Sequence, residues 1–140
     1  RGPSMTADAL YGEALKALAE TSRGHGRLDH PDATATVDNP LCGDRVTLDV
    51  ALQGDCVAAI GHEVKGCLLC EAAAAVVAAE ACGHDRGEIA DWPQQVRAFL
   101  KDAEVPAPLA GLAPFAPVRR FRSRHRCVTL AFEALAKALG

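Results

Sequence analysis

Hydrophobic positions first recur near the amino terminus, at the spacing of an amphipathic helix. The stripe consists of Ala9, Leu10, Ala14, Leu15 and Leu18. Intervals of three and four residues place such side chains on one helical face. Gly24 follows at a point where a helix would already have ended. We therefore expect an amphipathic helix as the first element.

A period of two residues follows between residues 33 and 64. Residues 33–37 form a short segment that tolerates β-structure. Hydrophobic residues then alternate with polar or small ones at Val46, Leu48, Val50 and Leu52. After a turn-like Gln53-Gly54-Asp55, a second alternating set consists of Cys56, Ala58, Ile60, His62 and Val64. The pattern predicts three strands, the last two joined as a hairpin.

Helical patterns return in the second half of the chain. The alanine-rich stretch 67–82 has high helix propensity and ends before Gly83. Residues 92–101 predict a second helix, with Pro93 tolerated in its first turn. A closing helix begins at Arg126 or Cys127, with one stripe of Val128, Phe132, Leu135 and Leu139. Four prolines, at 106, 108, 114 and 117, predict a loop before it.

These elements predict an α+β fold, in which a three-stranded antiparallel sheet packs against several helices. The 140 residues fit one domain, which we place at residues 5–140. A chain of this length buries about two-thirds of the surface that its unfolded form exposes. Residues 1–4 precede Met5 and resemble a remnant of an expression vector.

Composition narrows the class of protein. Apolar residues make up 49% and charged residues 24% of the chain, and no apolar run reaches the ~18 residues of a membrane span. We find no pattern of a secretory signal, so we expect a cytoplasmic protein without a membrane partner. The six cysteines are then expected to be reduced thiols available for metal or redox chemistry.

The net charge of -3 gives no general signature of nucleic-acid binding. The exception is a basic run just before Cys127, formed by Arg119, Arg120, Arg122, Arg124 and Arg126. A solvated surface segment would explain it equally well. Its position beside a cysteine favours a functional role.

Three cysteines and one aspartate are spaced as a single metal site. Cys42, Cys67 and Cys127 come from three separate elements, and Asp44 stands two residues after Cys42. Thiolates are the ligands that zinc and iron-sulfur centres select, and an oxygen donor can complete a tetrahedron. Cys127 is expected to start a helix among arginines, which should lower its pKa and make it the most reactive thiol.

The residues around these ligands carry a family resemblance. Asn39-Pro40-Leu41-Cys42-Gly43-Asp44, then Gly66-Cys67, then Arg124-His125-Arg126-Cys127 occur in that order. The chain resembles the iron-sulfur cluster assembly proteins SufU and IscU, whose domain is also the amino-terminal part of NifU-type proteins. The long separation of Cys67 from Cys127, and a basic residue immediately before Cys127, are closer to the SufU type.

The resemblance implies a function and a site. It implies metal ligands at Cys42, Asp44, Cys67 and Cys127, holding Zn²⁺ or an iron-sulfur cluster. Cys127 would accept persulfide sulfur from a SufS-like cysteine desulfurase, with Arg124 orienting the partner or the sulfur. Other iron-sulfur assembly or acceptor proteins would be further partners. Two roles stay open: a zinc-dependent sulfurtransferase or a non-enzymatic scaffold for a nascent cluster.

Two alternatives come from other classes of protein. Cys67 and Cys70 form a Cys-x-x-Cys pair, as in dithiol oxidoreductases, although the strand order does not match a thioredoxin fold. The ligands could also form a structural zinc module that binds another protein.

Four residues outside the ligand set also receive an interpretation. Cys56 and Cys82 are interpreted as small hydrophobic residues, and His62 as a core residue. His125, next to the expected site, could assist proton transfer or replace Asp44 as a ligand.

Overall fold

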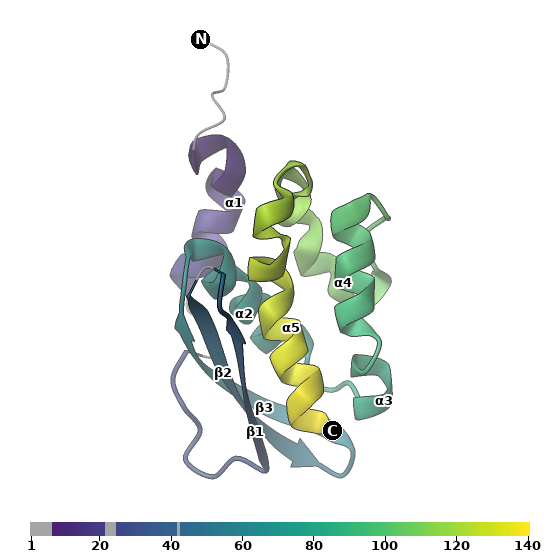
Figure 1. The fold of residues 1–140 in the computed structure, drawn as a ribbon. Coiled ribbons are helices and arrows are strands. Elements are labelled where there is room, and N and C mark those ends of the chain that lie inside the picture. The colour runs from purple at the N-terminus through teal and green to yellow at the C-terminus, as the bar shows by residue number, and fades with distance from the viewer. Residues whose placement is uncertain (1–6, 22–24, 42) are drawn as a thin grey trace.

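The computed structural model describes residues 7–21, 25–41 and 43–140, with side chains from residue 12 onward. Figure 1 shows a sheet on one side of the molecule and helices on the other. The elements are α1 (Ala7–Thr21), β1 (Ala33–Asn39), β2 (Asp44–Gln53), β3 (Cys56–Lys65), α2 (Leu68–Glu80), α3 (Arg86–Ile89), α4 (Trp92–Lys101), the 3₁₀ helices η1 (Ala107–Arg120) and η2 (Arg122–Arg124), and α5 (His125–Leu139). The predicted α+β class is confirmed.

The sheet is an antiparallel meander in the order β1-β2-β3. Its inner face carries Val46, Leu48 and Val50, all fully buried. An irregularity between Ala51 and Leu52 shifts the β2–β3 register. At this point β3 contains one residue more than β2. The additional residue changes the alternation at the start of β3, so that Val57 is buried and Cys56 is exposed. The expectation that Cys56 faces the core is therefore wrong.

Two helices cover the inner face of the sheet. α5 packs against β1 and β2, while α2 packs against β3, α1 and α5. Half of the buried residues of α2 are alanines, which lets neighbouring elements approach closely. Large side chains such as Phe99, Phe115 and Phe132 complete the core among α4, η1 and α5. Each such buried side chain stabilises the fold by roughly 1.5–3 kcal/mol.

The first helix is less regular than its sequence pattern predicts. Leu15 is buried and Leu18 packs against the core, as expected, whereas Ala14 is exposed. Gly12 interrupts the helical backbone with a φ of 57°. Glycine tolerates this left-handed conformation because it has no Cβ. Among the described side chains of α1, the predicted apolar stripe therefore holds at Leu15 and Leu18 but not at Ala14.

The segment that precedes β1 pairs with the edge of β3 and packs on part of the outer face of the sheet. Gly26 exchanges backbone hydrogen bonds with His62, and a Cβ at Gly61 would lie 2.5 Å from the Gly26 carbonyl oxygen. His62 is buried, as the sequence predicts. The carboxylate of Asp49 is also fully buried here, and it accepts hydrogen bonds from the Arg27 guanidinium at 2.6 and 3.0 Å.

Asp49 should make folding stability depend on pH in the acid range. Its pKa is lowered mainly by the hydrogen bond from Arg27, with further bonds from Thr34 and the Leu28 N–H. A carboxyl with a lower pKa in the folded state stabilises the fold above its unfolded pKa of about 4, and this contribution is lost as the pH falls through the folded value. We expect urea unfolding to show a smaller acid-induced loss in Asp49→Asn than in the wild type. Equal slopes would contradict this assignment.

The proline-rich segment is not the loop that its sequence predicts. Residues 107–120 form the 3₁₀ helix η1. Its buried residues recur at every third position: Leu109, Leu112, Phe115 and Val118. Three residues per turn is the period of a 3₁₀ helix, so this stripe seals one side of the core. The prolines are tolerated because they lie on or near the other side.

Two helix boundaries also differ from the sequence prediction. The short helix α3 was not predicted; a capping box between Asp85 and Glu88 starts it. α5 begins at His125, so that Cys127 is its third residue.

None of the helices in the described part of the chain has the length and apolar character of a membrane-spanning helix.

Candidate metal centre

Four side chains from three elements converge at one end of the sheet. Asp44 begins β2, Cys67 precedes α2, Cys70 lies in its first turn, and Cys127 lies in the first turn of α5. One ligand atom from each lies within 4.8 Å of the others. Three of these four belong to the predicted ligand set. Cys42, the remaining predicted ligand, lies outside the described residues.

The turn between β1 and β2 positions Asp44. Asn39 pairs with Asp44 across the two strands, and the N–H of Gly43 donates to the Asn39 carbonyl at 2.8 Å. Gly43 has a φ of 75°, a conformation that favours glycine. Asp44 itself is buried. This explains the Gly-Asp step of the sequence motif: the glycine makes the turn that directs the carboxylate inward.

Cys67 occupies the N-cap of α2. Its backbone is extended, with φ −78° and ψ 174°, and its carbonyl accepts the N–H of Cys70 at 3.0 Å. The pKa of the Cys67 thiol is lowered, chiefly by hydrogen bonds from the thiols of Cys127 and Cys70 and also by backbone N–H groups of α2. A helix amino terminus stabilises a thiolate in this way.

The expectation that Cys127 has the lowered pKa is wrong. Its pKa is raised, mainly by its hydrogen bond to Cys67, and burial adds to the effect. The Cys127 thiol donates to Asp44 Oδ2 over 3.3 Å. The pKa of the buried Cys70 thiol is raised as well, by hydrogen bonding with the Cys127 and Cys67 sulfurs and by burial. Of these three thiols, Cys67 is the one whose pKa is lowered.

The donor set fits a tetrahedral metal ion. Zn–S bonds of about 2.3 Å place sulfurs about 3.8 Å apart in a tetrahedron, so separations up to 4.8 Å require only a small contraction. Gly66 leaves room for this set. A Cβ at that position would lie 2.8 Å from Asp44 Oδ1 and 3.1 Å from Cys70 Sγ. The Gly-Cys motif thus combines a ligand with the space that its neighbours need.

Replacing Gly66 by alanine should weaken metal binding without unfolding the protein. The added methyl group would displace the Asp44 carboxylate, and repositioning a ligand typically costs 10–100-fold in metal affinity. We expect at least a ~10-fold loss of Zn²⁺ affinity, measured by competition with a chromophoric chelator. Gly87→Ala is the matched control, because a Cβ there meets only Asp85 Oδ1, at 3.3 Å. An unchanged affinity in Gly66→Ala would contradict the role of this glycine.

Arg124 and His125, which stand just before Cys127, are not among the clustered donors. Arg124 precedes α5 and is half-buried. The Nε2 atom of His125 lies 3.1 Å from both the Val118 and the Arg119 carbonyl oxygens. The imidazole is therefore engaged with the η1 backbone, and His125 is not one of the four clustered donors.

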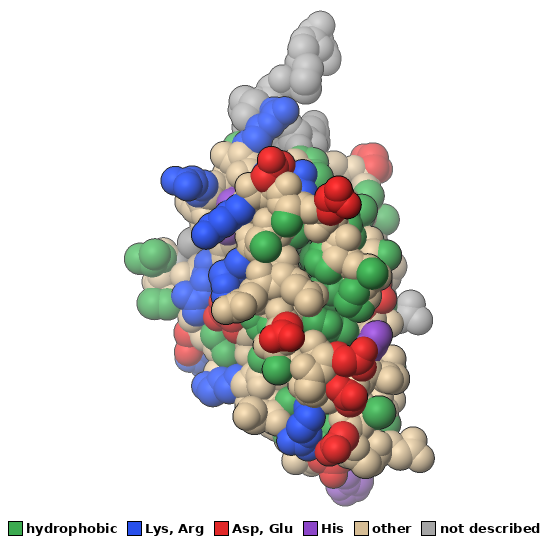
Figure 2. All heavy atoms as spheres, turned by 90° about the vertical axis from the view of Figure 1, so that its right-hand side faces the viewer, with side chains coloured by type: hydrophobic (Ala, Val, Ile, Leu, Met, Phe, Trp, Pro, Cys, Tyr) green, Lys and Arg blue, Asp and Glu red, His purple; other side chains and the backbone are tan. Residues whose placement is uncertain are grey.

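The arginine run divides into structural and exposed members. Arg119 donates to the carbonyls of Phe99 and Ala103 at 2.8 and 2.6 Å, and its guanidinium stacks 4.5 Å from the Phe99 ring centroid. It ties η1 to the end of α4. Arg120 and Arg122 are exposed. On the face of the molecule that Figure 2 shows, most Lys and Arg side chains gather at the upper left.

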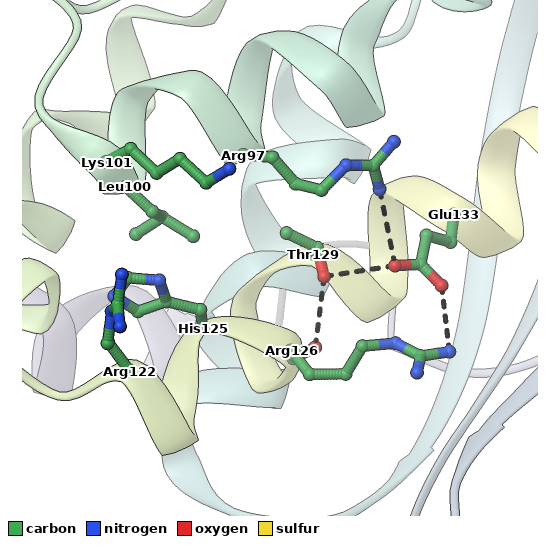
Figure 3. Close-up of a pocket in the computed structure, with 8 residues that line it drawn as sticks. All are labelled: Arg97, Leu100, Lys101, Arg122, His125, Arg126, Thr129 and Glu133. Atoms are coloured by element: carbon green, nitrogen blue, oxygen red, sulfur yellow. Dashed lines mark hydrogen bonds and ion pairs between the residues drawn. The ribbon is translucent and has the colours of Figure 1, made fainter.

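A basic pocket lies between α4 and α5. It has a volume of about 290 Å³, and its lining residues are Arg97, Leu100, Lys101, Arg122, His125, Arg126, Thr129 and Glu133. Figure 3 shows the Glu133 carboxylate between Arg97 and Arg126. Among the residues drawn in Figure 3, Lys101 and Arg122 are the basic side chains that form no ion pair with a carboxylate.

The remaining cysteine interpretation is also corrected. Cys82 follows α2 but is exposed, and its thiol makes only long contacts of 3.8 and 3.9 Å to backbone carbonyls. It is not a core residue. Cys70 was left open by the sequence, and its position shows that the Cys-x-x-Cys pair belongs to the cluster. The signal was the i, i+3 spacing, which places both thiols at one end of a helix.

Comparison with known proteins agrees with this geometry. The chain is 26% identical to the zinc-dependent sulfurtransferase SufU of Bacillus subtilis, covering 94% of this chain and 90% of that protein. It is 29% identical to the iron-sulfur cluster assembly scaffold protein IscU of Streptococcus pyogenes, covering 93% and 82% of the two chains.

Solved structures and a family model extend the comparison. A NifU-like protein (N-terminal) from Brucella abortus superimposes with a TM-score of 0.86 at 30% identity, covering 94% of this chain and 93% of that one. A putative SufU scaffold protein from Fervidobacterium islandicum gives a TM-score of 0.88 at 22% identity, covering 96% and 100%, which supports the fold alone. The model of the NifU-like N terminal domain matches residues 11–111, a stretch that includes Asp44, Cys67 and Cys70. The chain therefore belongs to the NifU-like N-terminal domain family.

Proposed function

We propose that this protein acts in iron-sulfur cluster assembly, accepting sulfur at Cys127 beside a metal held by Cys42, Asp44, Cys67 and Cys127. The observation that carries the proposal is the convergence of Asp44, Cys67 and Cys127 from three elements into one cluster, in which Asp44 and Cys127 are buried. Relatives named as a zinc-dependent sulfurtransferase and as a cluster scaffold support the same process.

Zinc is the resident metal that the donor set favours in the sulfur-acceptor role. Bound there, Zn²⁺ would keep its cysteine ligands deprotonated. The carboxylate of Asp44 is the hard oxygen among soft sulfurs, so it is the weakest ligand of the set. The Asp44 carboxylate accepts a hydrogen bond from the Cys127 thiol. It would accept this hydrogen bond again whenever Cys127 leaves the metal.

Access to the site is expected from the β1–β2 turn. Cys127 is fully buried, so sulfur transfer requires the partner to displace neighbouring residues. A hollow of about 450 Å³, lined by the turn and by Lys65, reaches Asp44. Leu41, at the turn, exposes 95% of its surface. An exposed apolar side chain beside a buried reactive group is a suitable anchor for a partner protein.

The partner that we propose is a cysteine desulfurase, which supplies sulfur as a cysteine persulfide. Arg122, Arg124 and Arg126 stand just before Cys127 in the chain, and they would meet acidic groups of the desulfurase. Arg122→Glu should therefore weaken desulfurase binding about 10-fold, with the largest effect at low salt. Binding measured by calorimetry at two salt concentrations checks this. Lys137→Glu, the same charge change at the far end of α5, should bind normally; equal losses would remove Arg122 from the interface.

Metal and sulfide content test the proposed function. The protein should be purified without oxygen and assayed for zinc, iron and acid-labile sulfide. About one zinc per chain without sulfide is expected for the sulfur acceptor. Iron with matching sulfide would instead make the chain a cluster scaffold. Neither metal, together with disulfide reductase activity in an insulin assay, would replace both roles by a dithiol oxidoreductase.

A further inference from the structure

The proposed site contains one thiol more than a tetrahedral metal requires. Cys42, Asp44, Cys67 and Cys127 already supply four ligands, yet Cys70 Sγ also lies within 4.8 Å of the Asp44, Cys67 and Cys127 donor atoms. Cys70 is fully buried, so it is not a surface thiol. Cys70, the second cysteine of the Cys67-x-x-Cys70 pair, therefore has no role in the proposed function.

The backbone allows these two cysteines to form a disulfide. Cys67 is the N-cap of α2 and Cys70 is in its first turn. Residues three apart on a helix have Cα atoms about 5 Å apart, within the range of about 4.4–6.8 Å found for disulfides. Cys67 is only half-buried, whereas Cys70 is enclosed. A more accessible cysteine at the N-cap, followed by a buried one, is the order of an attacking and a resolving thiol.

Sulfur delivered to Cys127 would need two electrons before it could leave as sulfide. The outer sulfur of a persulfide has the oxidation state of elemental sulfur, whereas cluster assembly uses sulfide. Cys127 has no exposed surface, which keeps a thiol from solution away from it. The nearest reductants are the two thiols already in contact with it.

We propose that Cys67 and Cys70 form an internal dithiol that reduces the persulfide on Cys127, an inference that rests on the proposed function. In the metal-free site, Cys67 Sγ attacks Cys127 Sγ and forms a Cys67–Cys127 disulfide. The bond between Cys127 and the outer sulfur breaks, and that sulfur leaves as HS⁻. Cys70 Sγ then attacks Cys67 Sγ, which forms the Cys67–Cys70 disulfide and returns Cys127 as a thiol.

The two steps balance. Cys127–S–S⁻ and two thiols yield a Cys127 thiol, one disulfide and HS⁻, so the two thiol protons end on Cys127 and on the sulfide. The dithiol loses two electrons and the outer sulfur gains them. A dithiol reductant must then reduce the disulfide before the next cycle. Because the disulfide removes Cys67 as a ligand, the oxidised chain should also bind zinc poorly.

Single-turnover sulfur transfer tests the inference. The chelated full chain is freed of reductant, treated without oxygen with a cysteine desulfurase and L-cysteine, and then digested for peptide mapping by mass spectrometry. The wild type should release about one sulfide per chain and contain the Cys67–Cys70 disulfide. Cys67→Ser should retain the persulfide on Cys127 and release less than a tenth of that sulfide, whereas Cys70→Ser should release the sulfide but stop at a Cys67–Cys127 disulfide. Cys82→Ser, which changes an exposed thiol, should behave as the wild type.

The possible outcomes distinguish a failure of this inference from a failure of the proposed function. A stable Cys127 persulfide in the wild type, without a disulfide, would overturn the internal dithiol and leave sulfur acceptance intact. No sulfur on Cys127 in any variant, and no sulfide from the wild type, would overturn both. Zinc titration of the oxidised chain gives a second measurement that does not involve the desulfurase. A Zn²⁺ affinity equal to that of the reduced chain would also contradict a disulfide at Cys67.

Discussion

Cys127→Ser is expected to abolish sulfur acceptance. A serine hydroxyl remains protonated where a cysteine forms a thiolate, so it cannot take sulfur from a persulfide. Loss of a nucleophile typically lowers a rate by at least about 10³-fold. Incubation with a cysteine desulfurase and L-cysteine, followed by intact mass analysis, should show no added sulfur on the variant. In the Cys67→Ser background, in which the persulfide is expected to persist, the effect should be clearest.

Controls for this prediction come from the same chain. Cys127 is fully buried in α5, so circular dichroism and thermal unfolding must show that Cys127→Ser still folds. Cys56→Ser alters an exposed cysteine outside the cluster and should accept sulfur as the wild type does. Persulfide found on Cys67 in Cys127→Ser would move the acceptor role to the cysteine at the N-cap of α2.

The fold followed from the sequence wherever one period governed an element. Alternation at Val46, Leu48 and Val50 identified β2, and the alanine-rich stretch identified α2. The sequence failed where another rule applied. One extra residue reversed the faces at Cys56, and a three-residue period in η1 was hidden by prolines that usually mark loops. Both failures arise because local patterns do not report register or the choice between helix types.

The site was predicted in part for a related reason. Asp44, Cys67 and Cys127 each stand where an element begins, and motif order alone was enough to group them. Cys70 needed the helix start to be known, because only from an N-cap at Cys67 does the i+3 side chain point at the same cluster. The raised pKa of Cys127 could not be predicted either, since it depends on the thiol contacts and not on the flanking arginines.

Zinc affinity should distinguish the ligands from the surplus thiol. Cys67 donates one of the proposed four bonds, and its thiolate is already stabilised by the amide groups of α2. Cys67→Ser should therefore lower Zn²⁺ affinity by at least about 100-fold, more than the loss of a residue that only supports a ligand. Cys42→Ser should show a loss of the same size. Competition with a chromophoric chelator at fixed pH measures both.

Cys70→Ser gives the opposite expectation and decides the ligand set. If Cys42 completes the tetrahedron, removing the Cys70 thiol should change Zn²⁺ affinity by no more than about threefold, because no metal bond is lost. Gly66 lies against Cys70 Sγ, so the smaller serine side chain fits without displacing Asp44. A loss in Cys70→Ser as large as in Cys67→Ser, with normal binding in Cys42→Ser, would place Cys70 in the coordination sphere. Cys70 would then not be free to act as the resolving thiol while metal is bound.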